Sequence, residues 1–136
     1  MTEEFFLGNT TGLILQVYRE MVDELGDKRY SLLLIKKALY SRLMDVDLKV
    51  KKDVETVMRI GKTHMGGYKA HLLVDDQILV QLFWVSSGLA ISHRSQIRTI
   101  LMDGSWPVGL GLNFGATRWD SIRVENRVVF HTKEIA

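Results

Sequence analysis

Residues 68–85 read Tyr-Lys-Ala-His-Leu-Leu-Val-Asp-Asp-Gln-Ile-Leu-Val-Gln-Leu-Phe-Trp-Val, and this stretch decides the fold of the chain. Two short apolar runs flank the polar residues Asp75-Asp76-Gln77. Apolar runs of this length, separated by a few turn-forming residues, are typical of a β-hairpin. We therefore predict two paired strands that are joined at Asp75-Asp76-Gln77.

The sequence on both sides of this hairpin alternates between helical and extended patterns. Helical spacing of apolar residues predicts helices over 13–25, 30–44 and 92–102, and extended patterns predict strands over 48–57, 108–114 and 120–130. Ser92 is expected to cap the third helix, and Lys36 in the second is expected to face solvent. This order predicts an α/β fold in which helices flank a mixed β-sheet, within one domain over residues 1–136.

Composition limits the class of protein. The chain has 136 residues, of which 46% are hydrophobic and 25% charged, as expected of a globular domain with a core. The absence of cysteine excludes disulfides and thiolate metal sites and is compatible with a reducing cytoplasm. The sequence contains no apolar run long enough to span a bilayer, and its acidic start does not resemble a secretory signal. We expect a cytoplasmic protein with no membrane partner.

The hairpin resembles the active-site hairpin of the PD-(D/E)XK nuclease superfamily, and specifically that of the small GxxExxY proteins. In that family the first strand carries a metal-binding Asp and the second carries Glu-x-Lys. Residues 12–21, 37–50 and 93–97 are also similar to family segments, and Val-Gly-Leu-Gly-Leu-Asn-Phe-Gly at 108–115 is the most specific match. The resemblance implies a PD-(D/E)XK nuclease-like core with a mixed sheet flanked by helices.

The departures from the family pattern are concentrated at its functional positions. The Gly-x-x-Glu-x-x-Tyr motif would fall around residues 29–35, where Leu32 takes the place of the acidic residue. The Asp, Glu and Lys positions of the hairpin correspond to His71, Gln81 and Phe83. Gln96, on the following helix, is retained.

These replacements remove the chemistry of a hydrolytic metal site. Mg²⁺ requires hard, anionic oxygen ligands, and Gln81 supplies an oxygen without a charge. The nitrogen of His71 suits transition metals better than Mg²⁺, and Phe83 can neither donate a proton nor stabilise a phosphate. The four histidines show no compact ligand spacing. We predict an inactive nuclease fold that carries no metal and no cofactor.

Three functional hypotheses follow. Our main hypothesis is association with protein, including self-association into a homo-oligomer or a larger structural assembly, because apolar residues replace polar ones around the expected cleft. These apolar residues could equally fill the cleft from within the same chain. The candidates for that contact are Leu33, Leu34, Phe83 and Trp84. The second hypothesis is a non-cleaving nucleic-acid-binding module, because arginines accompany tryptophans in the second half of the chain. Its candidates are Arg94, Arg98, Arg118 and Arg123. The third is a nuclease whose metal site has moved.

Overall fold

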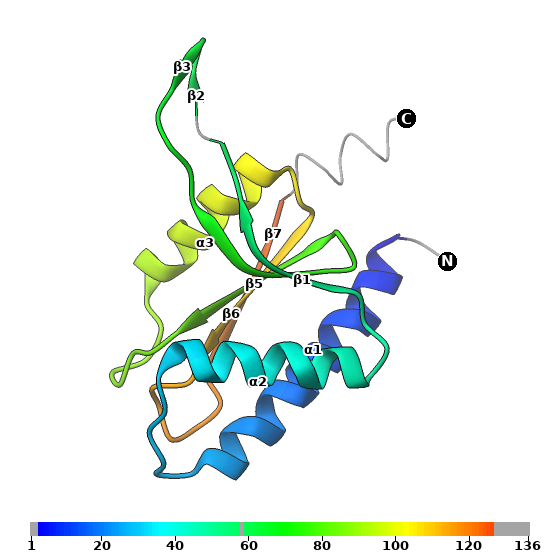
Figure 1. Cartoon of the computed structure of the whole chain (residues 1–136), viewed down its shortest axis with the longest axis vertical. Coiled ribbons are helices and arrows are strands. Elements are labelled where there is room, and N and C mark those ends of the chain that lie inside the picture. Colours follow the sequence, from blue (N-terminus) through cyan, green and yellow to red (C-terminus); the bar gives the residue numbers. More distant parts are fainter. Residues whose placement is uncertain (1–2, 58, 127–136) are drawn as a thin grey trace.

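The computed structural model describes residues 3–57 and 59–126 (Figure 1). The elements follow in the order α1 (Glu3–Leu25), α2 (Leu32–Asp45), β1 (Val50–Glu55), β2 (Arg59–Ile60), β3 (Thr63–His64), β4 (Lys69–Val74), β5 (Ile78–Phe83), α3 (Ile91–Gly104), β6 (Val108–Asn113) and β7 (Ser121–Glu125). The predicted hairpin is confirmed as β4 and β5. Asp75 and Asp76 form its turn with φ values of +52° and +58°, a conformation that short acidic and amide side chains tolerate.

Five strands form the main sheet in the order β1-β4-β5-β6-β7. Neighbouring strands are antiparallel except β5 and β6, which are parallel and are connected through α3. The predicted mixed α/β architecture is therefore confirmed. Every residue of β5 and β6 is buried, as expected of central strands that are covered on both faces.

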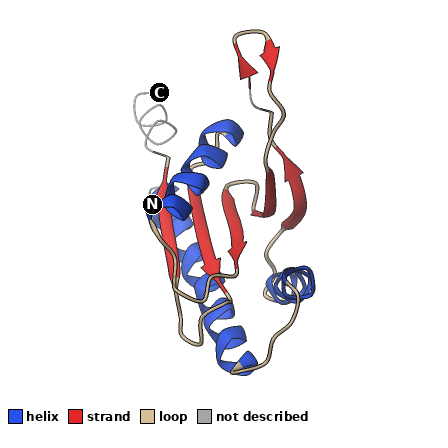
Figure 2. Cartoon of the chain, turned by 90° about the vertical axis from the view of Figure 1, so that its left-hand side faces the viewer, coloured by secondary structure: helices blue, strands red, loops and turns tan. Residues whose placement is uncertain are grey.

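Helices cover the sheet on both faces, with α3 on the face opposite α1 and α2 (Figure 2). The larger core cluster joins α1 and α2 to side chains that include Leu72, Val80 and Leu110. The smaller cluster joins α3 to Leu79, Phe83 and Val124. No helix among the described residues is long and apolar enough to cross a membrane.

Several local predictions require correction. The first helix begins at Glu3 rather than Leu13, and Leu7, one of its added residues, is buried. Ser92 is not the cap of the third helix, because α3 begins at Ile91 and His93 Nδ1 accepts the hydrogen bond of the Ala90 N–H at 2.9 Å. The predicted strand over 120–130 is present as β7, and its residues 127–130 lie outside the described part of the chain.

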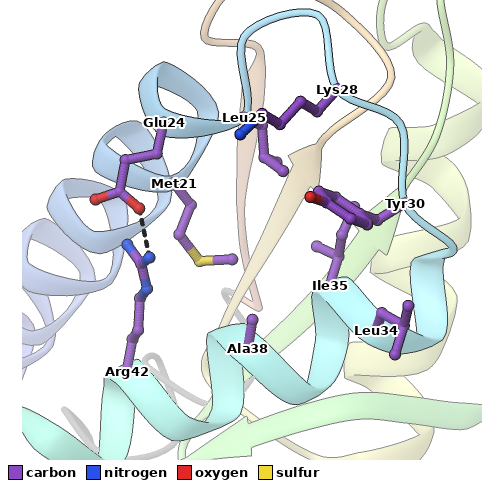
Figure 3. Close-up of a pocket in the computed structure, with 9 residues that line it drawn as sticks. All are labelled: Met21, Glu24, Leu25, Lys28, Tyr30, Leu34, Ile35, Ala38 and Arg42. Atoms are coloured by element: carbon purple, nitrogen blue, oxygen red, sulfur yellow. Dashed lines mark hydrogen bonds and ion pairs between the residues drawn. The ribbon is translucent and has the colours of Figure 1, made fainter.

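Two further features lie outside the sheet. Strands β2 and β3 form a small separate hairpin that projects from the body of the molecule (Figures 1 and 2). At the other end, α1, α2 and their connecting loop surround a hollow of about 460 Å³ (Figure 3). Its lining is mainly apolar, with Lys28 and the Glu24–Arg42 ion pair as its charged groups.

Candidate functional site

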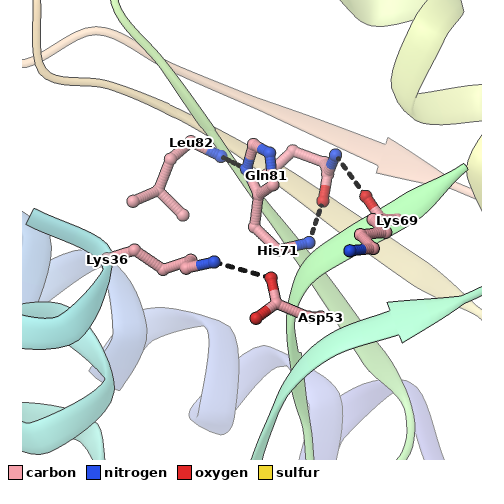
Figure 4. Close-up of polar contacts among 6 residues, drawn as sticks. All are labelled: Lys36, Asp53, Lys69, His71, Gln81 and Leu82. Carbon is pink, nitrogen blue, oxygen red and sulfur yellow. Dashed lines mark hydrogen bonds and ion pairs between the residues drawn. The ribbon is translucent and has the colours of Figure 1, made fainter. Parts of the chain in front are cut away.

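The hairpin positions that the resemblance assigns to metal ligands lie where the two strands separate. Main-chain pairing of β4 with β5 extends from Val74–Ile78 to Leu72–Val80. Beyond that point, Gln81 Oε1 accepts the His71 N–H at 2.6 Å, and Gln81 Nε2 donates to the Lys69 carbonyl at 3.3 Å. The His71 ring completes the bridge, because its Nδ1 accepts the Leu82 N–H at 2.8 Å (Figure 4). Two side chains thus connect the strands at the centre of the candidate site.

Both bridging side chains are neutral. Gln81 is 3% exposed, and both atoms of its amide are bonded to the main chain. Burial lowers the pKa of His71 below its ordinary value, and the charge of Lys36 lowers it further against a weaker opposite effect of Asp53. Because Nδ1 accepts a hydrogen bond, the neutral ring carries its proton on Nε2.

An ion pair between Lys36 and Asp53 lies beside this bridge. Lys36 Nζ lies 2.6 Å from Asp53 Oδ1, and the Lys36 side chain is only 15% exposed. The expectation that Lys36 faces solvent is therefore wrong. Asp53 has a φ of +53°. The apolar residues on either side of it pack in different clusters: Val50 packs in the larger cluster, with α1 and α2, and Val54 packs against the smaller cluster, with α3. This irregularity in β1 accompanies the placement of the Asp53 carboxylate against α2.

The resemblance to the PD-(D/E)XK superfamily implies a divalent metal, and the residues present do not fit one. His71 Nδ1 and Gln81 Oε1 are neutral acceptors that main-chain N–H groups already occupy. The nearby carboxylate of Asp53 is neutralised by Lys36. Within residues 3–57 and 59–126, no three His, Asp or Glu side chains are grouped to hold a metal ion. A Mg²⁺ site of the usual anionic oxygen ligands is therefore not assembled at this hairpin.

A shallow hollow remains beside the bridge, with a volume of about 190 Å³. It is lined by Leu32, Leu33, Lys36, His71 and Leu82. Leu32, at the position expected to be acidic, is half-buried against the α1–α2 cluster. Most of the surface that would have held charged groups is consequently apolar.

The remaining expected positions lie elsewhere. Phe83 is 9% exposed and packs in the α3 cluster, where its ring meets that of His93 edge-on with centroids 5.1 Å apart. It therefore faces the interior rather than a cleft or its rim. Gln96 is exposed on α3 and is not part of the His71–Gln81 bridge.

The candidate association residues are divided between surface and core. Leu33 and Leu34 are 57% and 52% exposed on the first turn of α2. Trp84 is half-buried, and the Arg29 guanidinium lies over its ring at 5.7 Å. The structure thus leaves Leu33 and Leu34 accessible and encloses Phe83.

The four candidate arginines do not form one surface. Arg94 and Arg98 are exposed on α3. Arg123, on β7, donates to Thr11 of α1 at 2.9 Å and therefore reaches the opposite face of the sheet. Arg118 is exposed in the loop after β6.

The projecting β2–β3 hairpin was not predicted from the sequence. The sequence signals of this hairpin are its glycines and a run of residues without Asp or Glu.

The family model of the PD-(D/E)XK nuclease superfamily matches residues 6–126. The chain belongs to this superfamily. None of the curated proteins searched matches it.

Two solved structures resemble the fold. The structure of SSO0001 has a TM-score of 0.57 and 17% sequence identity, and the match covers 74% of this chain and 55% of that one. The chain thus spans just over half the length of SSO0001. The alkaline exonuclease LHK-Exo from Laribacter hongkongensis has a TM-score of 0.51 and 13% identity, with 99% of this chain and 77% of that chain covered. At these identities the likeness concerns the fold alone.

Proposed function

We propose that this chain is a nuclease-fold protein that does not hydrolyse phosphodiesters at its hairpin and acts by associating with a second copy of itself. The observation that carries the proposal is a pair of exposed leucines on the first turn of α2, beside the His71–Gln81 bridge. Leu33 and Leu34 lie there, and Tyr30, just before the turn, is 48% exposed. Large apolar side chains grouped on a surface favour contact with another protein.

The shape of this surface supports a self-complementary contact. The first turn of α2 forms a ridge between two hollows: Tyr30 and Leu34 line the larger one, and Leu32 and Leu33 line the smaller one. Figure 3 shows Tyr30 and Leu34 at the edge of the larger hollow. In a two-fold contact the same patch serves both partners, so the ridge of one copy can lie against a hollow of the other. Each apolar Å² buried would contribute roughly 25 cal/mol.

The molar mass in solution, measured by light scattering over a range of concentrations, tests the association. We expect a mass that rises with concentration towards that of a dimer, and a monomer for the double variant Leu33→Asp/Leu34→Asp. Ile91→Asp/Met102→Asp is the matched control, because these residues are 82% and 59% exposed on α3, away from the ridge. A wild type that stays monomeric throughout, or an equal effect of the control, would refute self-association through this turn.

Hydrolysis is tested separately with single- and double-stranded DNA in the presence of Mg²⁺ or Mn²⁺. We expect no cleavage above that of a buffer control. Metal-dependent cleavage that is lost in His71→Ala or Gln81→Ala would contradict the proposal and indicate activity at the hairpin itself. Cleavage that both variants retain would favour a nuclease with a displaced site. This result is independent of the mass measurement, so the two parts of the proposal can fail separately.

A further inference from the structure

The β2–β3 hairpin, called the arm here and comprising residues 59–67, extends away from the body of the protein (Figures 1 and 2). Its two strands pair Arg59 with His64 and Ile60 with Thr63. Gly61 forms the tip with a φ of +58°. All of residues 59–65 are exposed. Because no other layer of the described structure covers these residues, their side chains are available to a partner. An isolated two-stranded hairpin has little stability of its own.

The root of the arm is firmly held. The Thr56 N–H donates to the Tyr68 carbonyl at 2.9 Å, and the Tyr68 N–H donates to Thr56 Oγ1 at 3.2 Å. Gly67 packs so closely that an added Cβ would lie 1.6 Å from the Thr56 carbonyl oxygen. The direction in which the arm leaves β1 and β4 is therefore defined by contacts at its base.

The arm carries positive charge and no negative charge. Residues 56–68 include Arg59, Lys62 and His64 and contain no Asp or Glu. Within the described part of the chain, neither Arg59 nor Lys62 forms an ion pair. Lys49, just before β1, and Lys51, within β1, differ in this respect, because both are paired with Asp76. The cations of the arm are thus available to an anionic partner.

We propose that the arm binds double-stranded nucleic acid, with Arg59 and Lys62 on backbone phosphates. This surface is distinct from the His71–Gln81 bridge and from the α2 ridge. Paired strands lie about 4.8 Å apart, and the major groove of B-DNA, about 12 Å wide, admits a two-stranded ribbon. A tip made of Gly61 and Lys62 is poorly suited to insertion into a bilayer, because an exposed ammonium resists transfer into hydrocarbon.

The test is fluorescence anisotropy of a short labelled DNA duplex with the full chain, over a series of salt concentrations. We expect salt-dependent binding of the duplex that is tighter than binding of the same single strand. The double variant Arg59→Gln/Lys62→Gln should lower the slope of log K against log salt by about 2, roughly 0.9 for each phosphate that the variant no longer neutralises. Circular dichroism checks that the variant remains folded.

The variant Arg94→Gln/Arg98→Gln is the matched control, because it removes the same charge from exposed positions on α3. The control should retain the wild-type slope. Absence of duplex binding at low salt, a wild-type slope in the arm variant, or an equal loss in the control would overturn the proposal. Binding of the single strand as tightly as the duplex would also overturn it. Competition by polyglutamate that equals competition by unlabelled duplex would overturn it too, because an acidic protein would then be the better partner.

Discussion

The main-chain N–H of His71 donates to Gln81 Oε1 at 2.6 Å, so a side chain of β5 supplies a hydrogen bond where the main chains of β4 and β5 have separated. The same amide donates from Nε2 to the Lys69 carbonyl. An amide suits both groups, because it accepts through oxygen and donates through nitrogen. A carboxylate could replace only the first of these bonds. The bridge therefore depends on a neutral side chain at a position where the superfamily resemblance leads one to expect an acid.

Gln81→Glu is accordingly expected to destabilise the protein. The substitution leaves the Lys69 carbonyl without its donor and places a charge on a side chain that is 3% exposed. We expect the free energy of unfolding at neutral pH to fall by about 1–3 kcal/mol, measured by denaturant titration. Gln96→Glu makes the same change at an exposed position and should stay within about 0.5 kcal/mol of wild type. Equal stability of the two variants would contradict the role given to the amide.

Stability should also depend on pH through His71. Because its pKa in the folded protein lies below the ordinary 6.5, the unfolded chain binds the proton more tightly. The free energy of unfolding should therefore be highest above pH 6.5 and should fall as the pH decreases from there towards the lowered pKa. Asp76, with a pKa of about 2, stays ionised throughout this window.

Denaturant titrations of wild type and His71→Gln, made on either side of that window, isolate this effect. We expect the loss of stability between mildly alkaline and mildly acidic pH to be smaller in His71→Gln, because the variant has no ring to protonate. An identical pH dependence in the two proteins would show that His71 is not the group responsible.

Local sequence patterns were sufficient to predict the elements that form the core. The turn at Asp75-Asp76-Gln77, the strand that begins at residue 108 and the end of the first helix at residue 25 all follow from apolar spacing and turn chemistry. The start of α1 was missed because polar residues such as Asn9 and Thr10 obscure the helical stripe there. The arm was missed because strands of two residues have no detectable period.

The site was less predictable than the fold, because its contacts join residues distant in sequence. Substitutions at His71 and Gln81 could be read from the chain, whereas their bonds to Lys69 and Leu82 depend on where β4 and β5 separate. The Lys36–Asp53 pair depends in addition on the irregular backbone of β1. A one-dimensional pattern identifies which side chains are present, and the register determines which groups they meet.

A second buried amide organises the loops at the end of β5 and β6. Asn113 Oδ1 accepts the N–H groups of Val85 and Gly115, both at 2.9 Å. Its Nδ2 donates to the Val85 carbonyl at 2.7 Å and to Asp120 Oδ2 at 2.9 Å. Asn113 is fully buried. All the hydrogen-bonding capacity of this amide is therefore used to join two loops that are far apart in sequence.

Asn113→Asp should consequently be severely destabilising. The new carboxylate loses both donated bonds and lies within hydrogen-bonding distance of the Asp120 carboxylate. We expect a loss of at least about 3 kcal/mol at neutral pH, seen as a shift of the denaturation midpoint. Asn9→Asp, at an exposed position of α1, should change the stability by less than about 0.5 kcal/mol. A small effect at Asn113 would mean that the loops are held together by other contacts.

Two glycines should respond to alanine in opposite ways. Gly12 lies within α1 with open space around it, so Gly12→Ala should stabilise the protein by about 0.5–1 kcal/mol. At Gly67 the new methyl group would overlap the Thr56 carbonyl oxygen, which is main chain and cannot simply rotate away. Gly67→Ala should therefore separate Thr56 from Tyr68 and speed hydrogen exchange of the Thr56 amide. Unchanged exchange at Thr56 would show that the root of the arm is not fixed by this contact.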